Sequence, residues 1–323
     1  MSEEKTKTTK FRNSVVLVGY LKETTLVEKV SQGGRHFITG NITVAVSEFD
    51  THRVRFLVFQ DNSAEMYEKL TKFLPNNTVS VASYLKSTPT ANFNTAASMA
   101  AKIWVVASLR EFASRDGERV KTMPVLDGFN IGKCDPDKTF DPKSDFEVDA
   151  YIESMEDEAD ENGNATGRLL VSALIPGYKG IMYRVPMVAQ VEMNTAKYMK
   201  NVYNVGDTAL LKGKLLAMKV TLQKDEGAES EFFGEVEEQQ YTTRFVREIV
   251  IKGGSKKPIP QGAEGSISKE SVKEGLVLRE TEMDKNGQHK GTKEAAPAED
   301  PAPAKTTPTQ TQTAPGFDDD CDF

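Results

Sequence analysis

Two arginines lie two positions apart, at Arg53 and Arg55, within the run THRVRFLVF over residues 51–59. Side chains alternate between the two faces of a β-strand, so both arginines project to one side while Val54 and Phe56 project to the other. A guanidinium group neutralises phosphate and stacks on unpaired bases. The spacing therefore predicts a strand whose outer face binds an anionic polymer such as a single nucleic-acid strand.

Six further residues extend this candidate surface with rings and positive charges. Each base that stacks on a ring contributes ~1–3 kcal/mol, so the aromatic residues matter as much as the charges. For every ring the alternative is packing in the core, which is our interpretation of Trp104 between two aliphatic neighbours. Besides Arg53 and Arg55, the candidate binding residues are Arg35, Phe37, Phe49, Tyr84, Lys86 and Phe93.

The elements that would position these residues form a small β-domain over residues 13–130, after a flexible arm at 1–12. Its runs are rich in Val, Ile and Phe and are bounded by Gly, Asn, Asp or Ser. Three strands, one helix and two strands in this order indicate an OB-fold, a five-stranded Greek-key barrel. The expected strands are Val15–Leu21, Phe37–Val46, Arg53–Phe59, Thr78–Lys86 and Lys102–Phe112, with a helix at Ser63–Leu74 and a loop at Ser87–Ala101 before the last strand.

A second set of the same elements follows over residues 131–252 and predicts a second OB-fold. Two unrelated β-domains in tandem are the alternative. The segment Val220–Gln240 is acidic and would repel phosphate, whereas Arg184, Lys212 and Lys214 could lengthen a binding site. The expected strands are Phe146–Met155, Gly167–Ile175, Ile181–Val188, Gly206–Ala217 and Tyr241–Ile251, with a helix at Asn194–Val202. The fold class is therefore all-β with short helices.

Five short stretches carry a resemblance to a known family. The first domain contains VVLVGYL at 15–21, NITVAVSE at 41–48 and HRVRF at 52–56, and the second contains GDTALLKGKL at 206–215 and YTT at 241–243. In this order they resemble the bacterial single-stranded DNA-binding protein (SSB) family. The two copies carry different parts of one family pattern, which favours a duplication.

The resemblance implies a phage or bacterial protein that binds single-stranded DNA without strong sequence preference in replication, recombination or repair, with no cofactor and no enzymatic activity. Family members present four OB-folds together, so a chain with two implies a homodimer. Thr51 and Leu57 stand where members commonly have aromatic residues, and Phe49 is a displaced substitute. These departures predict a protein that relies more on charge and less on stacking.

The C-terminal part has a different composition. Residues 253–316 are rich in Gly, Ser, Lys, Pro, Thr and Gln, which predicts a disordered linker with one weak apolar patch at Leu276–Leu278. The last residues, FDDDCDF, resemble the acidic tip through which the SSB family recruits replication and repair proteins, although Cys321-Asp322 departs from that pattern. A solvated tail is the alternative. The expected docking residues are Phe317, Asp318, Asp319, Asp320, Asp322 and Phe323.

Charge and composition narrow the function classes. The net charge is −7, but residues 1–130 carry 17 Lys and Arg against 13 Asp and Glu, while 131–252 carry 15 against 22. A mildly basic first domain followed by acidic segments fits an anion-binding protein, and an ordinary solvated surface is the alternative. No signal peptide and no apolar run of the ~20 residues that span a bilayer occurs, so we expect a cytoplasmic protein with no membrane partner.

Other functions remain open. The chain could be a protein-interaction or assembly module that kept the barrels but lost the binding face, an RNA-strand binder, or a replication enzyme with OB-fold parts. The last is disfavoured because no grouped carboxylates, nucleophile–histidine pair or phosphate-binding loop motif occurs. His36 and His52 lack partners at ligand spacing, and Cys134 and Cys321 form no CxxC pair, so no metal site or disulfide is expected.

Overall fold

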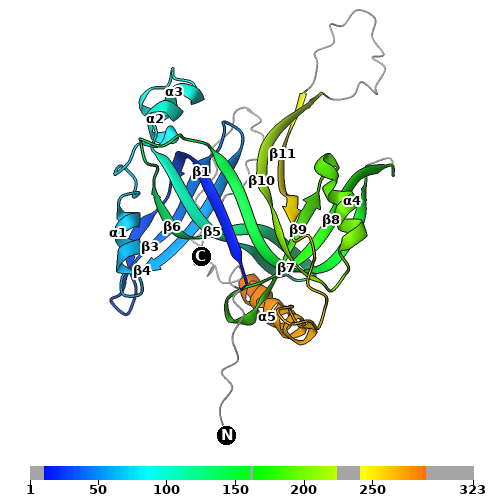
Figure 1. Ribbon diagram of the computed structural model, residues 1–323. Coiled ribbons are helices and arrows are strands. Elements are labelled where there is room, and N and C mark those ends of the chain that lie inside the picture. Colours follow the sequence, from blue (N-terminus) through cyan, green and yellow to red (C-terminus); the bar gives the residue numbers. More distant parts are fainter. Residues whose placement is uncertain (1–10, 161–162, 224–240, 289–323) are drawn as a thin grey trace, which may run out of the picture.

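The computed structural model describes residues 11–160, 163–223 and 241–288, and it contains two β-barrels side by side (Figure 1). In the first barrel β1 pairs with both β3 and β5, β3 pairs with β4, β5 pairs with β6, and a short parallel pairing of β4 with β6 closes the ring. This strand order is that of an OB-fold. The strands are β1 (Asn13–Thr24), β3 (His36–Ala45), β4 (Thr51–Phe59), β5 (Lys102–Asp116) and β6 (Arg119–Lys133), with β2 (Val27–Val30) at the edge beside β3.

The alternation of side chains explains why these runs form a barrel. Along β1 every second residue from Val15 to Leu21 is buried, which is the period-two pattern of a strand with one face in a core. Gly19 is required where β1 crosses β3, because a Cβ atom there would lie 2.3 Å from the carbonyl oxygen of Ala45. The core of the barrel is filled by aliphatic residues and by the fully buried Phe56.

The second barrel repeats the same closure. β7 pairs with β8 and β10, β8 with β9, β10 with β11, and β9 runs parallel to β11. All five strands and the helix predicted for residues 131–252 are present, so the prediction of two OB-folds is confirmed. The elements are β7 (Lys143–Ala159), β8 (Ala165–Pro176), β9 (Met182–Ala189), α4 (Thr195–Val202), β10 (Thr208–Gln223) and β11 (Tyr241–Gly254), with single 3-10 turns at Tyr178–Gly180 and Glu192–Asn194.

In the first barrel the prediction for the last two strands was wrong. The stretch from Thr78 to Lys86 contains a helix, α2 (Val81–Ser87), and the expected loop after it contains another, α3 (Phe93–Met99). The fourth strand of the barrel is β5, at the position predicted for the fifth, and the fifth is β6, which was not predicted. α1 (Ala64–Thr71) lies within the predicted helix.

A capping box at Ser80 explains why this stretch is helical. The Ser80 hydroxyl accepts a hydrogen bond from the backbone N–H of Ser83 at 3.1 Å, and the Ser83 hydroxyl accepts one from the backbone N–H of Ser80 at 2.9 Å. Two N–H groups that a helix start leaves without partners are thereby satisfied. The alternating valines of TVSVASYLK resemble a strand, but the serines between them fix a helix N-terminus.

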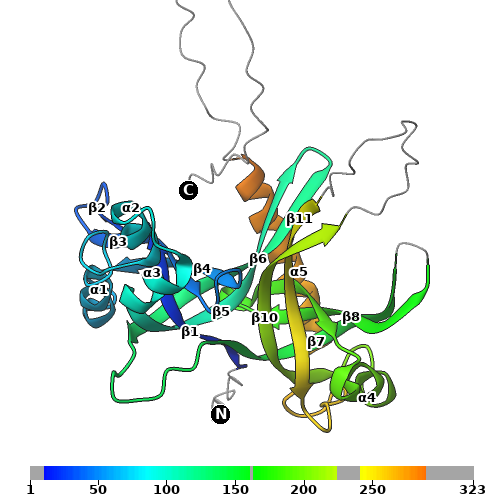
Figure 2. The same cartoon turned by 90° about the horizontal axis from the view of Figure 1, so that it is seen from above.

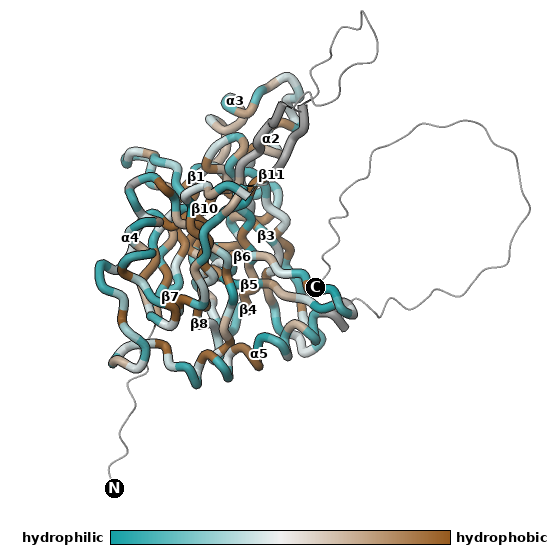
Figure 3. Tube along the Cα trace, turned by 90° about the vertical axis from the view of Figure 1, so that its right-hand side faces the viewer, coloured by the Kyte–Doolittle hydropathy of each residue, from teal (hydrophilic) through white to brown (hydrophobic). Residues whose placement is uncertain are grey.

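The two barrels form one continuous sheet, because β1 also pairs antiparallel with β7. A helix, α5 (Lys269–Gln288), packs against β5 of the first barrel and β9 of the second (Figures 1 and 2). The linker prediction is therefore wrong for residues 269–288. Figure 3 shows hydrophobic residues concentrated along the strands and a mixture along α5, which explains the error: part of its packing is made by charged side chains.

The charged contact that joins α5 to the barrels is buried. Arg279 of α5 donates to both carboxylate oxygens of Glu111 on β5, at 2.6 and 2.7 Å, and Glu111 also accepts from the backbone N–H of Arg184 on β9 at 2.9 Å. One carboxylate thus contacts α5 and both barrels. The hydrogen bonds to Glu111 raise the pKa of Arg279, which keeps its guanidinium charged.

Candidate nucleic-acid interface

The outer face of β3 and β4 carries half of the eight predicted binding residues. Ile42, Val44, Val54 and Phe56 are buried inside the barrel, so the residues that alternate with them face outward. Across the two strands Asn41 lies opposite Arg55, Thr43 opposite Arg53, and Phe37 opposite Phe59. The sequence prediction of the side on which Arg53 and Arg55 project is confirmed.

An aromatic pair lies at one end of this face. The rings of Phe37 and Phe59 are 5.1 Å apart between centroids and tilted by 31°. The guanidinium of Arg35 lies 4.6 Å from the centroid of Phe59 and is held by Asp61 at 3.0 Å and Asn62 at 2.9 Å. Two adjacent rings and a cation form a surface on which unpaired bases can stack.

Phe59 was not among the predicted binding residues, although the sequence contains the signal for it. The alternation that places Arg53 and Arg55 outside also places Leu57 and Phe59 outside, and Phe59 lies at the end of the same strand. The ring that the family pattern led us to seek at Leu57 is thus found two positions later. That binding relies more on charge and less on stacking stays a prediction, and Phe59 adds a ring to this face.

Exposed aliphatic residues continue the aromatic pair. Leu57 is 59% exposed and Val27 of β2 is 43% exposed, and both lie opposite Thr39. A hydrogen bond joins α1 to β2: the hydroxyl of Tyr67 on α1 donates to the carboxylate of Glu28 on β2. This hydrogen bond raises the pKa of Tyr67 to about 12. An apolar surface on an otherwise polar barrel is the type of surface that a ligand covers.

The two arginines of β4 differ in their partners. Arg55 forms a bidentate pair with Asp127 of β6 at 3.0 and 3.2 Å, and Asp127 also contacts Arg110 at 3.3 Å. Arg53 is exposed and takes part in no ion pair with any residue that the structure describes. Arg53 therefore offers its full charge to a ligand, whereas the charge of Arg55 is partly neutralised.

Four predicted residues lie elsewhere. Phe49 is at the tip between β3 and β4, half exposed, and lines a groove toward the second barrel. Tyr84 and Phe93 lie on α2 and α3, where both rings pack into a small cluster with Val81, and Lys86 is exposed on α2. The prediction that Tyr84 and Lys86 project from a barrel strand was wrong, as was the loop position of Phe93.

The corresponding face of the second barrel is neutralised by its own carboxylates. Arg184 pairs with Glu153, Arg168 with Glu158 at 3.3 Å and Glu248 at 2.8 Å, and Lys212 with Glu147 at 2.6 Å. Burial alone would raise the pKa of Glu153, but hydrogen bonds from Arg184 and Ser172 lower it, so the carboxylate stays charged. This face offers less free positive charge than the first barrel.

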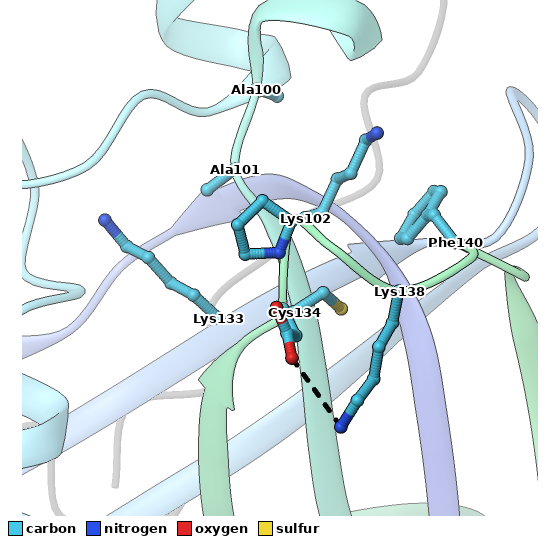
Figure 4. A pocket seen from close by; sticks show the side chains of 9 residues that line it. Ala100, Ala101, Lys102, Lys133, Cys134, Lys138 and Phe140 are labelled. Carbon is cyan, nitrogen blue, oxygen red and sulfur yellow. Dashed lines mark ion pairs between the residues drawn. The ribbon is translucent and has the colours of Figure 1, made fainter.

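A second cavity, of about 320 Å³, lies at the start of the connection between the barrels (Figure 4). Lys102, Lys133 and Lys138 line it, but their amino groups point in different directions, and Lys138 pairs with Asp135 at 3.6 Å. Burial raises the pKa of the Cys134 thiol, which disfavours the reactive thiolate. The cavity therefore has no convergent set of donors for an anion.

The remaining expectations concern metal sites, the two histidines, membrane spans and the acidic segments. Within residues 11–160, 163–223 and 241–288, no group of three or more His, Cys, Asp or Glu side chains could hold a metal ion. His52 contacts Asp50 at 3.0 Å, and His36 contacts Glu28 at 3.8 Å. No helix in the described part of the chain is long and apolar enough to cross a membrane. The acidic docking tip and most of the acidic segment 220–240 lie outside the described residues.

Comparisons with known proteins were made for the whole chain. Two solved structures of the single-stranded DNA binding protein from Thermus aquaticus, the wild type and a deletion mutant, are similar to 80% and 79% of this chain and 98% of theirs. Both share 14% sequence identity with it, with TM-scores of 0.42 and 0.44. At this level the likeness does not by itself establish fold or function. A search of curated proteins gave no significant match. A model of the YorF family matches residues 12–289, which include both barrels and α5, and the chain therefore belongs to the YorF family.

Proposed function

We propose that this protein binds single-stranded DNA on the outer face of its first barrel. The observation that carries the proposal is the Phe37–Phe59 ring pair, with the guanidinium of Arg35 beside it. Arg53, which forms no ion pair with any described residue, lies further along β4. Rings that stack bases and arginines that neutralise phosphates are the two components of a surface that holds an unpaired strand.

Little sequence preference is expected from this surface. Every base has a flat face that can stack, so rings alone do not distinguish bases. The polar side chains between the rings and the arginines are short, namely Thr39, Asn41 and Thr43. The role is one of binding and protection rather than catalysis, and it fits replication, recombination or repair.

The second barrel serves mainly to support the first in this proposal. Its Arg168 and Arg184 are paired with glutamates, and it is joined to the first barrel by the β1–β7 pairing and by α5. A homodimer with four OB-folds would place two binding faces in one assembly, and such a dimer is part of the proposal.

A titration with oligo(dT), duplex DNA and an RNA strand at several salt concentrations tests the proposal. We expect tight binding of oligo(dT), weak binding of the duplex, and a log–log salt slope of about −0.7 for each phosphate contacted. Arg53→Glu should weaken oligo(dT) binding by roughly tenfold and reduce the slope by about one such contact. Arg53 is the better target than Arg55, because a carboxylate at Arg55 would repel Asp127 and disturb the barrel.

Lys252→Glu, an exposed residue of β11, is the matched control because it makes the same charge change on the second barrel. It should leave binding close to that of the unaltered protein. Weak binding that does not respond to salt would contradict the proposal and favour the protein-interaction module. Tighter binding of the RNA strand than of oligo(dT) would reassign the substrate.

We also propose that residues 317–323 recruit replication or repair proteins. Four aspartates between two phenylalanines suit a pocket with one apolar hole and a basic rim. Deleting 317–323 should abolish capture of such proteins in a pull-down while leaving oligo(dT) binding unchanged or tighter. Capture that persists after the deletion would refute a docking role for the tip.

A further inference from the structure

A groove of about 260 Å³ lies between the two barrels, where the first barrel's binding face ends. Its lining comes from both barrels: Lys22, Phe49 and Thr51 from the first, and Ala217 and Arg247 from the second. Ala217 and Arg247 stand opposite each other on β10 and β11. The groove is therefore a place where a ligand on the first barrel would meet the second.

The groove is held in shape by a contact across the barrels. The carboxylate of Asp50 accepts a hydrogen bond from the backbone N–H of Ala217 at 2.9 Å and contacts the buried His52 at 3.0 Å. Asp50 immediately follows Phe49, so this contact fixes the tip that carries the ring. The ring itself remains 50% exposed, although it lies at a junction between barrels.

The charges in the groove suit a phosphate. Lys22 occupies an irregularity in β1, where the pairing with β3 shifts register between Leu21 and Glu23. Such bulges redirect a side chain. Neither Lys22 nor Arg247 takes part in an ion pair with a residue that the structure describes. Two other arginines of the second barrel, Arg168 and Arg184, are paired with glutamates. Against these two cations the groove has one carboxylate, Glu48.

The groove continues the face of β4 without a break. Phe59, Arg55, Arg53 and Thr51 project outward in turn along one strand, and Thr51 lines the groove. From Phe59 to Thr51 the strand advances by about 26 Å, at about 3.3 Å per residue. Rings thus lie at both ends of a line of arginines, with the Phe37–Phe59 pair at one end and Phe49 at the other.

From this geometry we propose that the DNA strand leaves the first barrel at Phe49 and enters the inter-barrel groove. There Phe49 stacks a base, while Lys22 and Arg247 neutralise phosphates. The second barrel then contacts the strand through Arg247 on β11 and not through Arg168 or Arg184. The inference rests on the proposed function, since it extends the path of the same strand.

Salt-dependent titration of the full chain with an oligo(dT) of about 20 nucleotides tests the inference. Arg247→Ala should weaken binding five- to tenfold at low salt and reduce the salt slope by about 0.7, because one phosphate contact is lost. Phe49→Ala should weaken binding by about tenfold without changing the slope, because it removes stacking and no charge. Lys252→Ala is the matched control, since Lys252 is exposed on β11 and does not line the groove.

The outcomes separate this inference from the proposed function. Oligo(dT) binding by the unaltered protein, with Arg247→Ala equal to it in affinity and slope, would overturn the inference and leave the proposed function intact. An equal loss in Lys252→Ala would also overturn it, because the effect would then come from the overall charge of the second barrel. Failure of the unaltered protein to bind any strand would overturn both.

Discussion

Replacing Phe37 and Phe59 together by alanine should weaken oligo(dT) binding by roughly a hundredfold, or about 2.7 kcal/mol. The two rings lie 5.1 Å apart on the outer face, and their loss removes the surface on which bases would stack. The salt slope should stay the same, because no positive charge is removed. Fluorescence anisotropy at several salt concentrations measures the affinity and the slope in one experiment.

Leu57→Ala is the control for this prediction. Leu57 lies on the same face of β4, between Arg55 and Phe59, and it is exposed and aliphatic. Its loss removes apolar surface without removing a ring, so the effect should be severalfold at most. A loss in Leu57→Ala as large as in the double variant would show that apolar contact, and not stacking, supplies the affinity.

The stability of the double variant must be measured beside its affinity. Phe37 and Phe59 are only half buried, and the barrel core beneath them consists of other residues, among them Ile38, Val54 and Phe56. We therefore expect the variant to stay folded. Full oligo(dT) affinity in a folded double variant would show that the ring pair is not the stacking surface.

The architecture was largely readable from the sequence, because OB-fold strands leave a period-two signal. β1, β3 and β4 each bury alternate residues, and β9 of the second barrel does so over most of its length. The error at Thr78–Lys86 arose where two signals compete. A short run of alternating valines fits a strand, but a capping box at Ser80 and Ser83 decides for a helix.

Only those features of the candidate site that depend on residues close together in the sequence could be predicted. The outward side of Arg53 and Arg55 follows from their own strand, whereas the bidentate pair of Arg55 with Asp127 depends on β6, which the sequence analysis missed. The groove is even less predictable from the sequence. Phe49 and Arg247 are far apart along the chain and line one groove only because the two barrels pack together. Non-local contacts of this kind leave no periodic signal in the sequence.

The assignment of residues 269–288 to a linker failed for an energetic reason. Composition predicts disorder when a segment cannot bury enough apolar surface. α5 buries Val272 and Met283, but it also buries Arg279 against Glu111, a contact that a count of hydrophobic residues does not register. The stability of α5 on the barrels should therefore depend on an ion pair.

Arg279→Ala should destabilise the protein by about 3–5 kcal/mol, the cost of leaving a buried charge without its partner. The side chains of Arg279 and Glu111 are only 6% and 3% exposed, and two hydrogen bonds join them. In the variant Glu111 would keep one contact, the backbone N–H of Arg184. Denaturant unfolding followed by circular dichroism measures the change in the free energy of unfolding.

Arg115→Ala is the matched control, because Arg115 also joins β5 to α5. It pairs with Asp284 at 2.8 Å and with Glu280, but it is 36% exposed, so its loss should cost about 0–1 kcal/mol. The double variant Glu111→Leu with Arg279→Met removes both charges and should recover most of the lost stability, though not all, because the N–H of Arg184 loses its acceptor. If Arg279→Ala lowered the free energy of unfolding no more than Arg115→Ala, the buried ion pair would not be what holds α5 in place. The apolar contacts of Val272 and Met283 would then hold it.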